Sequence, residues 1–363
     1  MASATNTGKG KPLYTQITLD LLLVVLSKTL FHPFIAWLIP LTLRSLSLPP
    51  THPRMITAYI YAICVTLFAV LARIDARLAW GSPREMDWDR ECVVITGGSG
   101  GLGRVIVEMF ARKGVSIAVL DVVPPRAVQG EEWENVHFYH CDVGNIEAVQ
   151  KVAKQMDADS LHPTILLNLA ATLHPSPLLS LPASLITSSL TTNLASSFNT
   201  IHTFLPHLLS SPTGGTIVTL SSVLGKLGAA NLATYTAAKA GQIALHNSVR
   251  AELALSSAPA GSDRIRMILV TPGQLATPLF DGIETPNNFL GPVVEPVELA
   301  KVVVQRICEG RSGEISLPVY ASMIGWLGVL PWSLQRLARW AAGVDGAMEG
   351  VVQRRARERA RGQ

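Results

Sequence analysis

The sequence predicts an α/β protein built on a doubly wound parallel sheet, with apolar segments before the sheet and an apolar, amphipathic extension after it. Short apolar runs of strand length alternate with longer segments of helical periodicity, which is typical of a parallel sheet covered by helices on both faces. The first apolar run, Cys92–Ile95, leads into a glycine-rich turn and then into the amphipathic segment Val105–Lys113. This order of strand, glycine turn and helix is the usual start of such a sheet.

The remaining elements follow from the same two patterns. We expect strands at Cys92–Ile95, Ser116–Asp121, His137–Cys141, Thr164–Asn168, Gly215–Ser221, Arg264–Val270 and Glu314–Leu317. We expect the helices between them to include Asn145–Met156, Leu185–Leu208, Leu232–Leu253 and Pro296–Glu309.

The glycine-rich turn predicts a phosphate-binding site. Glycines at positions 97, 101 and 103 remove the Cβ atoms that would keep backbone N–H groups away from a pyrophosphate, which the positive end of the helix would then hold. The next strand ends at Asp121, whose carboxylate could accept hydrogen bonds from ribose hydroxyls and would repel a 2′-phosphate. An ordinary loop and a turn-forming Asp are the alternatives when each feature is taken alone.

Three residues predict acid/base chemistry. Ser222 follows an apolar run, and Tyr235 and Lys239 lie four residues apart on one face of an expected helix. A lysine ammonium beside a phenol is expected to lower the phenol pKa, and the serine hydroxyl could hold a substrate oxygen. The alternative is a Tyr and a Lys on an ordinary surface helix.

Together these features resemble the classical short-chain dehydrogenase/reductase family over Glu91–Leu317. The family's TGxxxGxG and YxxxK motifs match Thr96 to Gly103 and Tyr235 to Lys239, and Ser222 lies thirteen residues before Tyr235, as the family's serine does. The resemblance implies a Rossmann-type fold and a nicotinamide cofactor. It implies the catalytic residues Ser222, Tyr235, Lys239 and Asn193, and the cofactor-binding residues Thr96, Gly97, Ser99, Gly101, Leu102, Gly103, Asp121, Asp142, Val143, Asn168, Tyr235, Lys239, Pro272, Gly273 and Thr277.

Asp121 favours NAD(H), with NADP(H) as the alternative if Arg104 or Arg126 reaches a 2′-phosphate. In the resemblance Tyr235 is the general acid/base, and Asn193 holds a water that links Lys239 to solvent. The family's Asn-Asn-Ala-Gly segment reads Asn168-Leu169-Ala170-Ala171 here, and this departure leans toward the alternative of a catalytically idle, membrane-anchored, NAD(P)-binding scaffold.

The composition points to a membrane. Hydrophobic residues make up 48% of the chain and charged ones 15%, against roughly 25% charged in soluble domains. Ile17–Leu43 is apolar but interrupted by charges and Pro33, which favours a broken, in-plane or hairpin segment. Met55–Ala72 is uncharged and near the roughly 20 residues needed to span a bilayer. A buried core helix is the alternative.

Four arginines follow that segment, and the four cysteines show no paired spacing, so we expect a cytosolic catalytic domain. The arginines are Arg73, Arg77, Arg84 and Arg90.

The chain after the last strand is apolar again. Tryptophans and arginines in Tyr320–Trp340 suit a helix lying in the lipid interface, with a dimer contact or a cover over the substrate cleft as alternatives. The expected organisation is a disordered N-terminus (1–16), a membrane-anchoring region (17–80), a catalytic domain (88–318), the extension (319–350) and a basic tail (351–363).

The whole architecture resembles the branch of membrane- and lipid-droplet-associated retinol and hydroxysteroid dehydrogenases. This resemblance implies a small lipophilic alcohol or carbonyl substrate (a retinoid, a steroid or a long-chain lipid), contact with membrane lipids, and a place on the endoplasmic reticulum or lipid droplets. We expect apolar residues of the loop Asp281–Val294 to line the substrate site: Ile283, Phe289, Leu290 and Val293. The scattered histidines predict no metal, the net charge of +4 predicts no nucleic acid, and a homodimer stays open.

Overall fold

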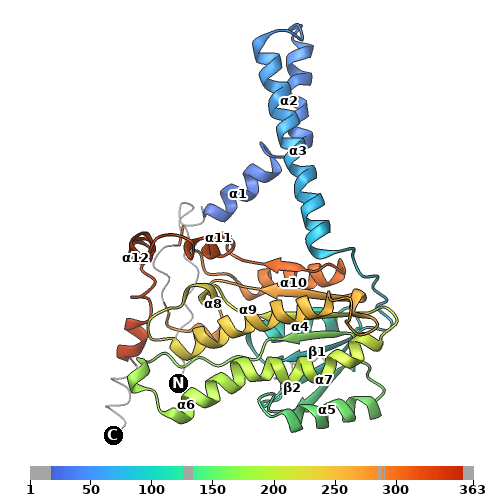
Figure 1. Cartoon of the computed structure of the whole chain (residues 1–363), viewed down its shortest axis with the longest axis vertical. Helices are drawn as coiled ribbons and strands as arrows, with labels where there is room; N and C mark the ends of the chain where they lie inside the picture. The colour runs from blue at the N-terminus through green and yellow to red at the C-terminus, as the bar shows by residue number, and fades with distance from the viewer. Residues whose placement is uncertain (1–17, 126–133, 284–287, 290, 355–363) are drawn as a thin grey trace, which may run out of the picture. The chain divides into compact units, whose positions relative to one another are not determined.

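A computed structural model describes residues 18–125, 134–283, 288–289 and 291–354. These residues form two compact units, Met1–Gly81 with Asn287–Pro292, and Ser82–Pro286 with Val293–Gln363. Each unit is described by itself (Figure 1). The N-terminus expected to be disordered, Arg126, Leu290 and most of the basic tail lie outside the described residues.

The larger unit contains a seven-stranded sheet in which all pairs are parallel. The spatial order is β3-β2-β1-β4-β5-β6-β7, so the chain moves outward from β1 in one direction and then from β4 in the other. This is the doubly wound arrangement that the sequence predicts, and ligands bind such sheets where the order reverses, beyond the carboxyl ends of β1 and β4. The strands are β1 (Cys92–Thr96), β2 (Ser116–Asp121), β3 (Val136–His140), β4 (Ile165–Asn168), β5 (Gly215–Leu220), β6 (Ile265–Val270) and β7 (Gly313–Ile315).

Helices cover both faces of this sheet (Figure 1). Buried side chains of α4 (Gly101–Ala111) and α10 (Pro296–Cys308) pack against one face. Those of α5 (Ile146–Ala158), α7 (Ser196–Ser210) and α9 (Ala233–Leu253) pack against the other. Strands β1, β4, β5 and β6 are buried along their whole length, which explains why most of their residues are apolar.

The predicted strands agree with the observed ones to within two residues at each end. The helix expected at Leu185–Leu208 is instead α6 (Ala183–Leu190), a π-helical turn at Thr191–Ala195, and α7. The extension expected as one helix is also divided, into α11 (Tyr320–Leu327) and α12 (Trp332–Ala341). Pro331 lies in the break and has no backbone N–H with which to continue a helix.

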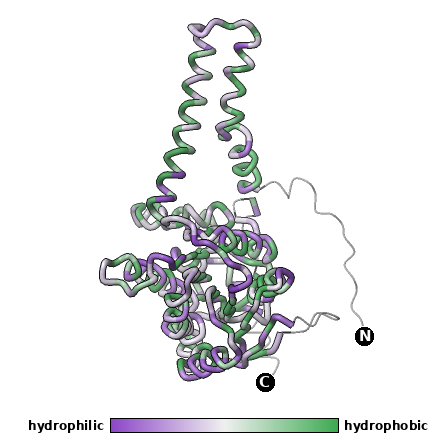
Figure 2. The backbone as a smooth tube through the Cα atoms, turned by 90° about the vertical axis from the view of Figure 1, so that its right-hand side faces the viewer, coloured by the Kyte–Doolittle hydropathy of each residue, from purple (hydrophilic) through white to green (hydrophobic). Residues whose placement is uncertain are grey.

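The smaller unit contains α1 (Leu19–Lys28), α2 (Pro33–Ser45) and α3 (Pro53–Trp80). Helices α1 and α2 are bent by 54°, as the expected broken segment requires, and α2 packs along α3 (Figures 1 and 2). The Trp37 indole donates a hydrogen bond to the Thr66 hydroxyl at 3.0 Å, and the Tyr61 hydroxyl donates to the Leu30 carbonyl.

Among the described residues, α3 is one helix long and apolar enough to cross a membrane, and α1 with α2 passes the same test as a bent pair. The uncharged stretch Met55–Ala72 lies inside α3, which runs on through Arg73 and Arg77. Figure 2 shows hydrophobic residues along much of α2 and α3.

Candidate active site

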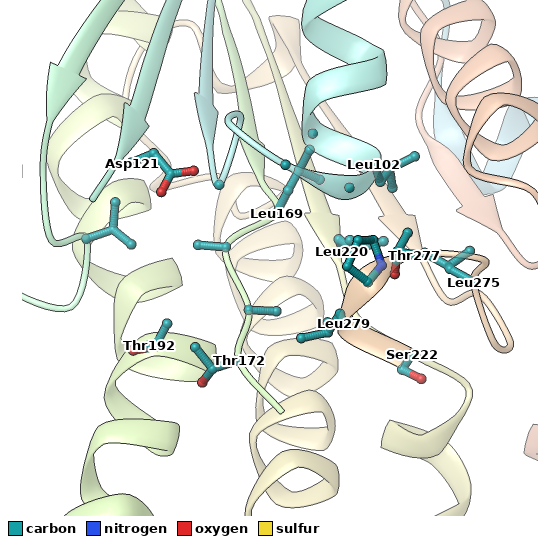
Figure 3. Close-up of a pocket in the computed structure, with 18 of the residues that line it drawn as sticks. Leu102, Asp121, Leu169, Thr172, Thr192, Leu220, Ser222, Leu275, Thr277 and Leu279 are labelled. Atoms are coloured by element: carbon teal, nitrogen blue, oxygen red, sulfur yellow. The ribbon is translucent and has the colours of Figure 1, made fainter. Parts of the chain in front are cut away.

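A cavity of about 530 Å³ lies at the carboxyl ends of the strands (Figure 3). Asp121 lies on one side of it and Ser222 on the other, so the pocket extends across the switch point between β1 and β4. Of the residues that the sequence singles out, the cavity is lined by Gly97, Gly101, Leu102, Gly103, Asp121, Asp142, Val143, Ser222, Tyr235, Lys239, Pro272, Gly273 and Thr277.

The glycine turn is packed so closely that side chains would not fit. A Cβ on Gly103 would lie 2.2 Å from the carbonyl oxygen of Gly97, and a Cβ on Gly97 would lie 2.8 Å from the Cα of Ala170. Gly97 also has φ of +68°, and Gly101 has φ of +51°, in the left-handed region that glycine adopts without strain. The turn therefore brings its backbone directly to the wall of the cavity.

The N-terminus of α4 opens onto the same cavity. Its N-cap is Gly100, which has no capping side chain, and its first turn carries no acidic residue. The first N–H groups of a helix lack partners within the helix, and together with the helix dipole they favour a bound anion. The arrangement fits a phosphate or pyrophosphate group held by backbone alone.

Asp121 connects the glycine turn to the end of β2. Its carboxylate accepts hydrogen bonds from the backbone N–H of Ser99 at 3.1 Å and of Val123 at 3.3 Å. The carboxylate therefore braces the turn and also faces the cavity, as the sequence predicts for a group that meets ribose hydroxyls. Arg104, which could attract a 2′-phosphate, is paired with Glu108 at 2.9 Å.

Four predicted site residues do not line the cavity. The Thr96 hydroxyl accepts hydrogen bonds from the N–H groups of Leu169 and Ala170, at 3.1 and 3.2 Å. The Asn168 side-chain oxygen accepts a hydrogen bond from the Thr200 hydroxyl at 2.7 Å, and the Asn168 side-chain nitrogen is buried without a partner in the described part of the chain. Ser99 and Asn193 are the other two residues.

The departure at Leu169 has a structural explanation. The Leu169 side chain is buried in the apolar core of the sheet, while Thr96 fixes the backbone that Leu169 shares with Ala170. The wall of the cavity at this point is made by Leu169, Ala170, Ala171 and Thr172. The segment therefore keeps a defined path along the cavity without the family's second Asn and its Gly.

Ser222, Tyr235 and Lys239 come together at the other end of the cavity. Ser222 follows β5, where its hydroxyl accepts a hydrogen bond from the N–H of Leu224 at 3.2 Å. Tyr235 and Lys239 lie on α9, and the Lys239 ammonium nitrogen lies 5.6 Å from the centre of the Tyr235 ring. The spacing of four residues thus brings both groups to one face of the helix, as predicted.

The pKa of Tyr235 differs from the expectation that the Lys239 ammonium lowers it. Burial raises the pKa of Tyr235, and a hydrogen bond with Ser222 lowers it to a smaller extent. Burial also lowers the pKa of Lys239 to about 7. Burial disfavours the charged form of each group, so desolvation rather than the nearby ammonium dominates at Tyr235.

Asn193 and Lys239 have different hydrogen-bond partners. The Asn193 amide, at the π-helical turn, accepts from the Thr172 N–H at 2.8 Å and donates to the Thr172 carbonyl at 3.0 Å. Lys239 donates to the Leu220 carbonyl at 2.7 Å and to the Gln242 side-chain oxygen at 2.9 Å. Gln242 was missed by the sequence reasoning, although its position three residues after Lys239 places it on the same helix face.

Apolar residues after β6 cover the side of the cavity near Tyr235. Leu279 and Phe280 line it, and the Phe280 ring meets the Tyr235 ring edge-on, with centroids 6.4 Å apart. Ile283, expected as substrate lining, packs with these residues. Phe289 belongs to the smaller unit, Leu290 lies outside the described residues, and Val293 precedes Val294, which pairs with Leu275.

Comparisons with known proteins agree with this geometry. Residues 91–288 match the family model described as short chain dehydrogenase. The chain belongs to the short-chain dehydrogenase family. An uncharacterized oxidoreductase of Saccharomyces cerevisiae, TDA5, is 30% identical over 296 residues, which is 78% of this chain and 88% of the yeast protein.

More distant members are also similar. Human epidermal retinol dehydrogenase 2 is 27% identical over 268 residues, covering 72% of this chain and 85% of that protein. A solved short chain dehydrogenase from Burkholderia cenocepacia in complex with NADP has a TM-score of 0.56 at 22% identity, covering 71% of this chain and 99% of that one. This structural likeness shows the fold. Family membership makes the chain a dehydrogenase/reductase.

Proposed function

We propose that the protein transfers a hydride between a nicotinamide cofactor and a lipophilic alcohol or carbonyl compound, with Tyr235 as the acid/base. One observation carries the proposal. A single cavity holds an anion-binding glycine turn and Asp121 at one end and Ser222, Tyr235 and Lys239 at the other. A dinucleotide bound by its pyrophosphate at the turn would extend toward the tyrosine.

The protein groups have separable tasks. A bound nicotinamide would supply or accept the hydride at the reacting carbon. Tyr235 gives a proton to the carbonyl oxygen in reduction, or takes the hydroxyl proton in oxidation, and the Ser222 hydroxyl orients that oxygen. Lys239, held by Leu220 and Gln242, favours the phenolate in oxidation through its ammonium form. The apolar side chains of Leu279 and Phe280 exclude water.

NAD(H) is the cofactor that the carboxylate at Asp121 favours. The group would repel a 2′-phosphate, and Arg104, one of the two predicted counter-charges, is paired with Glu108. A solved 4-hydroxyisoleucine dehydrogenase of similar fold is complexed with NADH, and the Burkholderia cenocepacia short chain dehydrogenase is complexed with NADP, so the fold accommodates either cofactor.

The proposed substrate class rests on the apolar residues of the cavity wall near Tyr235 and on the proposed attachment to a membrane. The walls near Tyr235 are Leu279 and Phe280, with Ile283 packed behind them, and none of these residues is charged. A retinoid, a steroid or a long-chain alcohol would bury its hydrocarbon part there, at roughly 0.8 kcal/mol for each CH₂ removed from water. The likeness to a retinol dehydrogenase supports the same class.

We also propose that α2 and α3 anchor the protein in a membrane, on the endoplasmic reticulum or on lipid droplets. Large apolar side chains on these helices face outward, including Phe34, Leu41, Phe68 and Leu78, whose exposed fractions run from 63% to 83%. At about 1.5 Å per residue, the 28 residues of α3 exceed the thickness of a hydrocarbon core of roughly 30 Å.

Only two of the four arginines that follow the apolar segment support the cytosolic orientation of the catalytic domain. Arg84 is buried and paired with Glu91, and Arg90 is paired with Asp87, so both charges are balanced within the fold. Arg73 and Arg77 remain as basic residues at this end of α3. The cysteines of the described chain are free thiols, as a reducing compartment favours.

The test of function is a screen of the purified full-length protein with retinoids, steroids, long-chain alcohols and polar sugars against both cofactors. We expect turnover of lipophilic substrates, and a loss of about a hundredfold or more in Tyr235→Phe, because the variant lacks the proton donor. Tyr139→Phe is the matched control, because Tyr139 lies on the edge strand β3, where its hydroxyl donates to Asp159 at the end of α5. Full activity in Tyr235→Phe, or better turnover of sugars, would refute the proposal, and cofactor binding without any turnover would favour the idle scaffold.

Membrane attachment has an independent test. We expect alkaline carbonate extraction to leave the full-length chain in the membrane pellet, and deletion of residues 1–80 to release much of it. Recovery of the intact chain in the soluble fraction would contradict the anchor, whatever the enzyme assay shows.

A further inference from the structure

Tyr235 shares an apolar cluster with a residue from the far end of the chain. Met348 is 6% exposed and belongs to one buried apolar cluster with Tyr235, Leu173 and Leu232. Leu279 and Phe280, which line the cavity, pack against this same cluster. Met348 therefore packs in an apolar cluster that adjoins the side of the cavity made by Leu279 and Phe280.

The segment that carries Met348 is tied down on the side of Ser222. Arg339 donates to the Leu227 carbonyl at 2.9 Å and pairs with Asp345, with 3.1 Å between Nε and Oδ2. Leu227 ends the short helix α8 (Leu224–Leu227), which begins two residues after Ser222. This connection fixes the start of the segment to the loop that presents the catalytic serine.

The segment is tied down on the other side as well. The Arg354 guanidinium donates to the carbonyl of Gly282 at 3.2 Å, just beyond the turn that carries Leu279 and Phe280. Residues 345–354, which we name the strap, therefore connect the loop after Ser222 with the turn after β6, and Met348 packs between these two walls.

We propose that the strap forms the outer wall of the substrate site, and that Met348 sets the size of the hydrocarbon group that the enzyme accepts. This inference rests on the proposed function. The cluster around Met348 presents hydrocarbon side chains, so the hydrocarbon part of a substrate placed against it would be removed from water. A thioether side chain is flexible and polarizable, and it adapts to an irregular ligand.

The test compares Met348→Ala and Met348→Trp with the wild type on a series of primary alcohols of increasing bulk. We expect kcat/KM for the bulkiest substrate, relative to the smallest, to rise about tenfold in Met348→Ala and to fall about tenfold in Met348→Trp, as filling or emptying a pocket does. Met323→Ala is the matched control, because Met323 is 60% exposed on α11. Unchanged ratios in both Met348 variants of an active enzyme would overturn the inference.

A second measurement does not require turnover or a tolerated substitution. A long-chain alcohol carrying a diazirine is photolysed with the full-length protein and its cofactor, and the labelled peptides are identified by mass spectrometry. We expect labelling of the peptide that contains Met348, and its loss when excess unlabelled alcohol competes. Labelling that spares this peptide would overturn the inference even if the enzyme is active. Labelling of the strap by an enzyme that turns over nothing would contradict only the proposed function.

Discussion

Replacing Gln242 by leucine should move the pH dependence of alcohol oxidation to lower pH. Burial holds the pKa of Lys239 near 7, so the ammonium form that favours the phenolate is present below that pH and lost above it. The Gln242 side-chain oxygen accepts a hydrogen bond from this ammonium at 2.9 Å, with both residues about 1% exposed. Leucine cannot accept this bond, so the pKa of Lys239 should fall and activity should be lost at a lower pH.

The size of the change follows from the type of hydrogen bond. A hydrogen bond to a charged group contributes about 1.5–3 kcal/mol net, and about 1.36 kcal/mol corresponds to a tenfold change in a protonation equilibrium. The pH at which half of the activity is lost should therefore fall by about one to two units. The Leu220 carbonyl remains as a partner at 2.7 Å, which keeps the lysine in place.

The assay is kcat/KM for a lipophilic alcohol between pH 5 and 10, with Gln242→Glu as the opposite perturbation. A carboxylate beside the ammonium favours the charged form, so this variant should keep its activity to higher pH than the wild type. Gln305→Leu on the exposed face of α10 controls for the substitution itself. If the pH profiles of Gln242→Leu and Gln242→Glu move in the same direction, or neither moves, Gln242 does not act through Lys239.

Three further predictions concern the cofactor end and the fold. Gly103→Ala should weaken NADH binding at least tenfold in a fluorescence titration, because its Cβ would lie 2.2 Å from the Gly97 carbonyl oxygen; unchanged affinity would contradict the close approach. Asp121→Asn should raise kcat/KM with NADPH relative to NADH, and a constant ratio would remove Asp121 as the selecting group. Arg84→Met should lower the thermal midpoint of unfolding by roughly 10 °C, because the variant leaves the Glu91 carboxylate buried without its ion-pair partner, at a cost of about 3–5 kcal/mol. Adding Glu91→Leu should recover much of this loss. No recovery in the double variant would show that the broken ion pair is not the cause.

The sheet could be predicted because the burial of each central strand is visible in its apolar sequence. Strands β1 and β4 to β6 lie inside the sheet with helices on both faces, so most positions are apolar or small. The exceptions are Asn168 at the end of β4 and Arg266 in β6. The catalytic and glycine motifs follow such strand ends or lie within one helix. Short-range spacing places each motif relative to its own strand or helix, and the order of the strands brings most of these residues to one cavity.

The break in the long helix could not be predicted from the sequence, because it coincides with hydrogen bonds to residues that are distant along the chain. The interruption of the long helix at Thr191–Ala195 coincides with Asn193, whose amide pairs with the backbone of Thr172. Nothing near position 193 in the sequence marks Thr172 as that partner. The role of Leu169 could not be predicted either. Only the structure shows that its side chain packs in the apolar core while the Thr96 hydroxyl accepts a hydrogen bond from its backbone N–H.

The same distinction separates the residues that touch the reacting atoms from those that hold them. Tyr235 and Lys239 are recognised from a short motif, but the groups around them come from three other parts of the chain. Ser197 accepts a hydrogen bond from Gln242, the Leu220 carbonyl accepts one from Lys239, and Met348 shares an apolar cluster with Tyr235. A motif therefore identifies the chemistry. The substrate that the chemistry acts on is decided by residues without a motif, because an apolar wall can be made from any segment that reaches it with enough hydrocarbon. For this reason the C-terminal strap, rather than the motif, is where substrate preference should change most readily without loss of turnover.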